Sequence, residues 1–85
     1  MKEFTYVVKD ELGIHARPAG LIVKKAKEFT SKVTIQAGGK SADATKLMAI
    51  MGMCVKQGAQ VHVTAEGDDE EQAIAAMEQF FNENL

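Results

Sequence analysis

The sequence predicts an α+β fold in which helices cover one face of a mainly antiparallel sheet. Alternating polar and apolar residues indicate four short strands, and apolar residues at helical spacing indicate three helices. The predicted elements follow one another in the order β-α-β-β-α-β-α. Helices packed on one face of such a sheet would bury their apolar stripes together with the apolar face of the sheet.

The first strand and the first helix are marked by a change of period. Phe4, Tyr6 and Val8 alternate with polar residues, as in a strand with one buried face. From Ala16 onward the spacing becomes helical, and Pro18 fits the first turn of a helix, where its missing N–H costs little. The expected apolar stripe of this helix consists of Ala19, Ile22, Val23, Ala26 and Phe29.

A hairpin, a short helix and a fourth strand are expected in the middle of the chain. Gly38-Gly39 predicts a tight turn between a strand over residues 32–36 and a return strand over residues 40–44. Residues 47–55 are apolar on almost every side and indicate a compact helix. Residues 60–65 alternate again and indicate the fourth strand.

The last element is expected to be an amphipathic helix. Asp68 and Glu71 fit an acidic variant of the capping box, and carboxylates in the first turn suit the helix dipole. The apolar stripe of this helix consists of Ala73, Ile74, Met77, Phe80 and Phe81.

Length and composition favour a single cytoplasmic domain over residues 1–85. Ten basic against twelve acidic residues give a net charge of −2, which argues against nucleic acid as the main partner. The first residues alternate instead of forming a signal-peptide block, and no apolar run approaches the ~18 residues of a membrane span, so we expect no stable membrane binding. Cys54 has no partner for an internal disulfide and no metal-ligand spacing around it. We expect this cysteine to be buried in the short helix.

Residues 13–19 (GIHARPA) place a histidine directly before a predicted helix and an arginine two residues later. A helix N-terminus offers free N–H groups, here those of Ala16 and Arg17, and a partial positive charge that favours a bound phosphate. The Arg17 guanidinium can add charge-assisted hydrogen bonds to phosphoryl oxygens, with His15 as the nucleophile. The alternative interpretation of His15 is an ordinary N-cap or loop histidine. His62 alternates with core positions and is expected to be a plain exposed histidine.

The chain resembles the family of HPr, the histidine-containing phosphocarrier of the bacterial phosphoenolpyruvate:sugar phosphotransferase system. The resemblance covers residues 4–81 and is most specific in the G-[IL]-H-x-R-P-A signature. Besides residues 13–19, the matching segments are residues 39–42 (GKSA), 47–48 (LM), 57–59 (QGA) and 65–70 (AEGDDE).

The resemblance implies an open-faced β-sandwich with three helices on a four-stranded antiparallel sheet of strand order 1-4-2-3. It implies that His15 accepts a phosphoryl group on Nδ1 from enzyme I, that Arg17 assists, and that sugar-specific IIA proteins or domains receive the group. A transcription regulator is a further candidate partner. We expect no cofactor and no metal, a stoichiometric carrier rather than an enzyme, and a monomer that leaves its site exposed.

A surplus of apolar residues on the second helix predicts a docking surface. A helix that is apolar all round cannot bury every position on a one-sided sheet. We expect Leu47, Met48 and Met51 to form an exposed patch beside His15, with Leu21 of the first helix as a candidate fourth member. The alternative is that these side chains belong to the core. Met-rich surfaces adapt to several partners, which favours the interface.

One position departs from the pattern of many relatives, which carry a regulatory serine at the start of the second helix. This chain has Lys46 there, preceded by Thr45, which we expect to cap the helix. Two other function classes remain as alternatives. Family members that lack the histidine only bind a transcription regulator, and His15 argues against that class. A small metal or nucleic-acid binder is disfavoured because paired cysteines, a basic excess and stacking aromatics on a strand are lacking.

Overall fold

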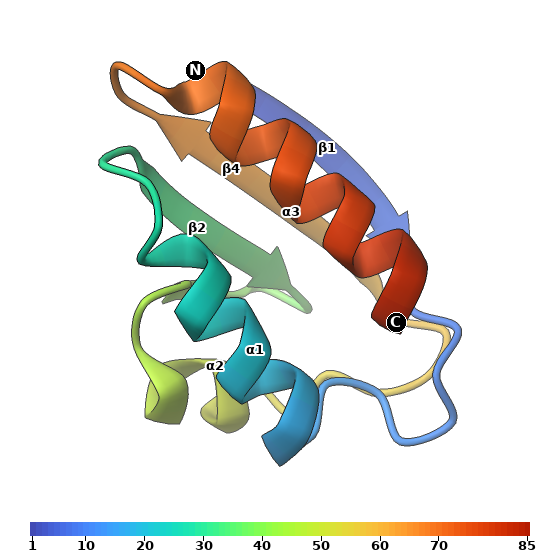
Figure 1. Ribbon diagram of the computed structural model, residues 1–85. Coiled ribbons are helices and arrows are strands. Elements are labelled where there is room, and N and C mark those ends of the chain that lie inside the picture. Colours follow the sequence, from blue (N-terminus) through green and yellow to red (C-terminus); the bar gives the residue numbers. More distant parts are fainter.

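A computed structural model describes residues 1–85 and has the predicted order of elements (Figure 1). The strands are β1 (Lys2–Val7), β2 (Lys32–Ala37), β3 (Lys40–Asp43) and β4 (Gln60–Glu66). The helices are α1 (Ala16–Ala26), α2 (Leu47–Gly52) and α3 (Glu70–Asn84). None of the three has the length and apolar character that crossing a bilayer requires.

The four strands form one antiparallel sheet in the order β1-β4-β2-β3, and the three helices lie on one of its faces (Figure 1). The predicted open-faced sandwich of strand order 1-4-2-3 is therefore confirmed. Val63 of β4 lies at the centre, opposite Phe4 of β1 and Ile35 of β2. The sheet thus joins segments about 60 residues apart in the chain.

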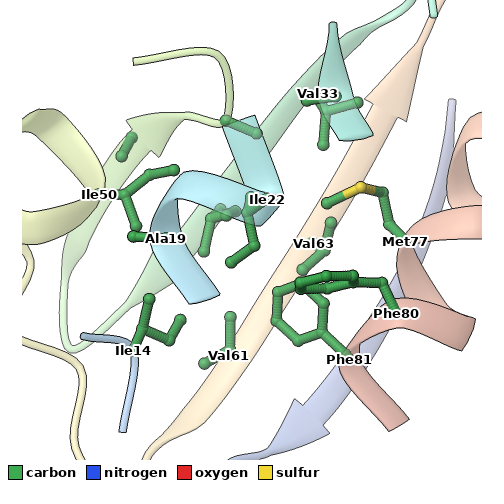
Figure 2. Packing of buried hydrophobic residues seen from close by; sticks show 14 of the residues in the cluster. Ile14, Ala19, Ile22, Val33, Ile50, Val61, Val63, Met77, Phe80 and Phe81 are labelled. Carbon is green, nitrogen blue, oxygen red and sulfur yellow. The ribbon is translucent and has the colours of Figure 1, made fainter. Parts of the chain in front are cut away.

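The core lies between the sheet and the helices, as the alternation of the strands requires (Figure 2). Phe81 of α3 is fully buried, and its ring meets those of Phe4 and Tyr6 edge to face at centroid distances of 5.5 and 5.8 Å. α1 ends at Ala26, so Phe29 packs on the core from the connection after the helix instead of from the helix itself. The largest fully buried side chains are Phe81, Ile22, Ile35, Ile50, Met77, Val8, Val33, Val61 and Val63.

The short helix α2 ends three residues earlier than predicted, and Cys54 is exposed instead of buried. Cys54 has a φ of 53°, in the left-handed region, which an α-helix cannot continue through. Its neighbours Met53 and Val55 are both buried. The chain therefore turns at Cys54 so that the residue on either side enters the core, and the thiol is left outside.

The start of α3 also differs from the prediction, because the predicted capping box of Asp68 and Glu71 does not form. Asp69 occupies the N-cap position and makes no side-chain bond to its own helix. Its carboxylate instead accepts hydrogen bonds from the N–H groups of Thr30 and Ser31, both at 2.9 Å, and from the Ser31 hydroxyl. The acidic residue before the helix thus fastens α3 to the connection between α1 and β2.

Replacing Asp69 by alanine is expected to lower the Tm by about 5 °C, because the N–H of buried Ser31 loses its acceptor. The matched control is Asp68→Ala, which removes an exposed carboxylate one residue away and should change the Tm by less than about 2 °C. We call the hydrogen bonds from Thr30 and Ser31 to the Asp69 carboxylate the Asp69 clamp. If thermal denaturation gives equal changes in Tm for the two variants, Asp69 does not form this clamp.

The same clamp predicts a pH dependence. The hydrogen bond from the Ser31 hydroxyl, followed by that from the Thr30 N–H, holds the pKa of Asp69 below its ordinary value. A carboxyl group with a lowered folded pKa stabilises the fold fully above its unfolded pKa, about 3.9, and this contribution is lost as the pH falls through the folded pKa. The difference in Tm between the wild type and Asp69→Asn should therefore stay constant down to about pH 5 and shrink as the pH falls below about 4. A constant difference would show that the charge of Asp69 plays no part.

Candidate functional site

His15 is the residue directly before α1, with buried Ile14 immediately before it and buried Pro18 three residues after it. Its backbone is extended, with φ −101° and ψ −171°, and its carbonyl accepts the first helical hydrogen bond, from the N–H of Ala19 at 2.9 Å. The imidazole is half-exposed and makes no capping bond to the helix. The ring nitrogens are therefore available to a reactant from outside.

The loop before His15 is fixed by a close approach of two backbones. Gly13 has a φ of 68°, and a Cβ placed on it would lie 2.2 Å from the carbonyl oxygen of Val55. No other residue fits this position. The N–H of Ile14 donates to the same Val55 carbonyl at 3.0 Å. These contacts explain in physical terms why a glycine stands two residues before the histidine.

Two backbone N–H groups at the start of α1 have no acceptor within the protein, those of Ala16 and Arg17. Pro18 has no N–H, and the next donor, Ala19, is already bonded. No acidic residue stands in the first turn of α1, so nothing on the helix itself offsets its positive end. This is the arrangement in which helix N-termini bind anions.

His15 and Arg17 line one shallow pocket of about 170 Å³. The Arg17 side chain is exposed and has no carboxylate within 4.0 Å, so its guanidinium is free to bind an anion. The remaining lining residues of this pocket are Asp10, Pro18, Leu21, Glu83 and Asn84. An imidazole without a partner in the protein and a free guanidinium thus line the same opening, at the end of α1 that carries the unbonded N–H groups.

The larger hollow of about 500 Å³ lies elsewhere, on the open face of the sheet around His62. Both ring nitrogens of His62 are engaged: Nδ1 lies 3.1 Å from the hydroxyl of Thr5, and Nε2 lies 3.2 Å from a carboxylate oxygen of Glu3. The side chain is about one third exposed. His62 is thus held by its neighbours, and the site with a free histidine is the smaller one.

The predicted docking residues differ in exposure. Leu21, Leu47 and Met48 are 39%, 42% and 80% exposed, whereas Met51 is half-buried and packs against the core. α1, which carries Leu21, and α2, which carries Leu47 and Met48, lie side by side (Figure 1). We call Leu21, Leu47 and Met48 the apolar patch. Met51 is left out of this patch because its side chain packs against the core.

The segment before α2 also departs from expectation, because Thr45 does not cap the helix. The N-cap residue is Lys46, whose side chain is exposed. The hydroxyl and N–H of Thr45 both donate to a carboxylate oxygen of Asp43, at 2.7 and 2.9 Å. The bond from the hydroxyl, followed by that from the N–H, holds the pKa of Asp43 below its ordinary value.

Sequence reasoning did not find three residues of the His15 pocket: Asp10, Glu83 and Asn84. Asp10 is close to His15 in the chain but looked like part of an ordinary loop. Glu83 and Asn84 lie at the end of α3, about 70 residues away, and no local signal places them there. Their position follows only from the sheet order, which sets α3 beside the loop after β1.

Known proteins share the fold and much of the sequence of this chain. The family model described as the PTS HPr component phosphorylation site matches residues 2–83. The phosphocarrier protein HPr of Mycoplasma capricolum subsp. capricolum is 38% identical over 93% of this chain and 89% of its own length. The phosphocarrier protein HPr of Lysinibacillus sphaericus is 42% identical, over 91% and 88%. A solved structure of the histidine-containing phosphocarrier protein of Mycoplasma superposes with a TM-score of 0.94 at 35% identity, covering 96% of this chain and 93% of that one. This chain therefore belongs to the HPr family, the phosphocarrier proteins of the phosphotransferase system.

Proposed function

We propose that this protein accepts a phosphoryl group on Nδ1 of His15 from phosphorylated enzyme I and donates it to sugar-specific IIA proteins or domains. The observation that carries the proposal is the place of His15, whose ring has no partner within the protein and lies beside two unbonded N–H groups and Arg17. In this proposal the protein is a stoichiometric carrier. As a monomer, it leaves the His15 pocket free for each partner in turn.

In the transfer step, the neutral imidazole of His15 keeps its proton on Nε2 and attacks phosphorus with the lone pair of Nδ1. A new N–P bond forms as the N–P bond of the donor histidine breaks, and the donor ring keeps the electron pair of the broken bond. No net proton is consumed. The same step in reverse order, with a IIA nucleophile as acceptor, unloads the carrier.

The groups around His15 stabilise the transferred phosphoryl group by positive charge and by hydrogen-bond donors that point toward its oxygens. The N–H groups of Ala16 and Arg17 offer two hydrogen bonds at the positive end of α1. The Arg17 guanidinium offers charge-assisted bonds to the remaining oxygens. Because the chemistry needs little covalent assistance, placing these donors is the main contribution of the protein to the transition state.

Replacing His15 by alanine should abolish phosphoryl uptake and leave the fold intact. The side chain makes no hydrogen bond within the protein, so the loss of stability should not exceed about 1 kcal/mol. Incubation with phosphoenolpyruvate and enzyme I, followed by intact mass, measures the uptake. His62→Ala is the matched control and should still take up one phosphoryl group. Normal stoichiometry in His15→Ala would refute the proposal.

Replacing Met48 by aspartate should weaken the binding of enzyme I at least tenfold and leave the Tm nearly unchanged, because this side chain is 80% exposed in the apolar patch. Met51→Asp should instead lower the Tm strongly, since it brings a charge next to the core. The control is Val7→Asp, at an exposed apolar position of β1 outside the patch. Equal weakening of binding by Met48→Asp and Val7→Asp, measured by titration, would exclude the patch as the docking surface.

Lys46 should exempt this protein from the serine-kinase control of its relatives. A lysine has no hydroxyl to modify, and the hydroxyl of Thr45 is occupied by its bond to Asp43. Incubation with an HPr kinase and ATP, followed by peptide mapping, should find no phosphate on the wild type and should find it on residue 46 of Lys46→Ser. Efficient modification of Thr45, or none in Lys46→Ser, would contradict this account.

A further inference from the structure

We propose that the carboxylates of Asp10 and Glu83 form an acidic wall of the His15 pocket that weakens its hold on the phosphoryl group and so keeps the loaded carrier a strong donor. This inference rests on the proposed function of His15 and assigns a role to two residues outside the phosphate-binding donors. Both residues line the pocket of about 170 Å³ that also holds His15 and Arg17.

The wall is assembled from two ends of the chain that the fold holds together. Asp10 belongs to the loop after β1, and Glu83 to the last turn of α3. The backbone oxygen of Leu85 accepts hydrogen bonds from the N–H groups of Lys9 and Asp10, at 2.6 and 2.8 Å. The end of α3 therefore lies against the loop, as Figure 1 shows. The backbone contacts therefore hold both residues at the rim of the pocket.

Neither carboxylate is neutralised by a cation. No lysine or arginine nitrogen lies within 4.0 Å of Asp10 or Glu83. Asp10 accepts from the N–H of Leu12 at 2.8 Å, and Glu83 accepts from the side-chain amide of Gln79 at 3.3 Å. Both partners are neutral, so the two negative charges act on whatever occupies the pocket, against the single positive charge of Arg17.

The effect on a phosphoryl group follows from its own charge. A phosphorylated side chain carries close to two negative charges at neutral pH. Carboxylates that share a small pocket with it repel it, while the N–H groups of Ala16 and Arg17 attract it. A carrier has to release its group as readily as it takes it up. The N–H groups and Arg17 alone would favour retention of the phosphoryl group. The acidic wall offsets part of their attraction.

Two substitutions remove the charges and keep the neutral hydrogen bonds. Glu83→Gln still offers an oxygen to Gln79, and Asp10→Asn still offers one to Leu12. The matched control is Glu78→Gln, which makes the same change of charge at an exposed site on the same helix but outside the pocket. A difference between the effects of Glu83→Gln and Glu78→Gln therefore reports the charge of Glu83 within the pocket.

The first measurement is the equilibrium of phosphoryl exchange between phosphorylated enzyme I and each variant at low ionic strength. We expect Glu83→Gln to shift the equilibrium toward the phosphorylated carrier by roughly threefold, and the double variant with Asp10→Asn by roughly tenfold. Glu78→Gln should match the wild type. Added salt should reduce the shifts, because the pocket is open to solvent. Equal values for Glu83→Gln and Glu78→Gln, or shifts that salt leaves unchanged, would overturn the proposal.

The second measurement needs no phosphoryl transfer. Inorganic phosphate is titrated into the unphosphorylated protein while the N–H signals of Ala16 and Arg17 are followed by NMR. Glu83→Gln should lower the phosphate Kd by roughly threefold relative to Glu78→Gln. If His15 never accepts a phosphoryl group but this Kd still falls, the proposed function fails and the acidic wall stands. If transfer is normal and neither measurement responds to Glu83→Gln, the acidic wall is refuted and the carrier function stands.

Discussion

The N–H of Ile14 donates to the carbonyl of Val55 at 3.0 Å, and the backbone at Gly13 comes so near that carbonyl that no side chain fits between them. This contact joins the loop before α1 to the segment after α2. It fixes the direction in which the chain enters α1, and therefore the place of His15 and of the free N–H groups behind it. It also requires the chain to leave α2 early, through the left-handed turn at Cys54, so that Val55 reaches the loop.

The order of the strands supplies what this loop contact cannot. Because β1 pairs with β4 instead of β2, the helix that follows β4 runs back across the start of the chain. Phe81 of α3 packs edge-on against Phe4 and Tyr6 of β1, and the last residues of the helix then bond to the loop after that strand. The pocket beside His15 consequently has one side from α1 and one from α3. Residues 13–19 provide His15 and the free N–H groups, and the order of the strands provides the rest of the opening.

This division explains which features were predictable from the sequence. The strands and helices follow from periodicity, because each period reports a local geometry, and the placement of His15 before a helix follows from residues 13–19 alone. The errors occur where a distant partner decides. Asp69 rather than Asp68 takes the N-cap position because its carboxylate serves Thr30 and Ser31, and Cys54 turns outward because Val55 is needed at the loop. Glu83 carries no local mark of its place beside His15, since only the pairing of β1 with β4 brings it there.

The two histidines of the chain show how surroundings decide chemistry within one small fold. His62 lies on the open face of the sheet with a carboxylate on one ring nitrogen and a hydroxyl on the other, so an attack by either nitrogen would first have to break a bond. His15 has no such partner, and its position before α1 gives it donors for an anion in place of acceptors for its own proton. A nucleophilic histidine is usually oriented by a hydrogen bond to its second nitrogen. In His15 the backbone takes this part instead: buried Ile14 and Pro18 fix the chain on either side, and the ring makes no hydrogen bond within the protein.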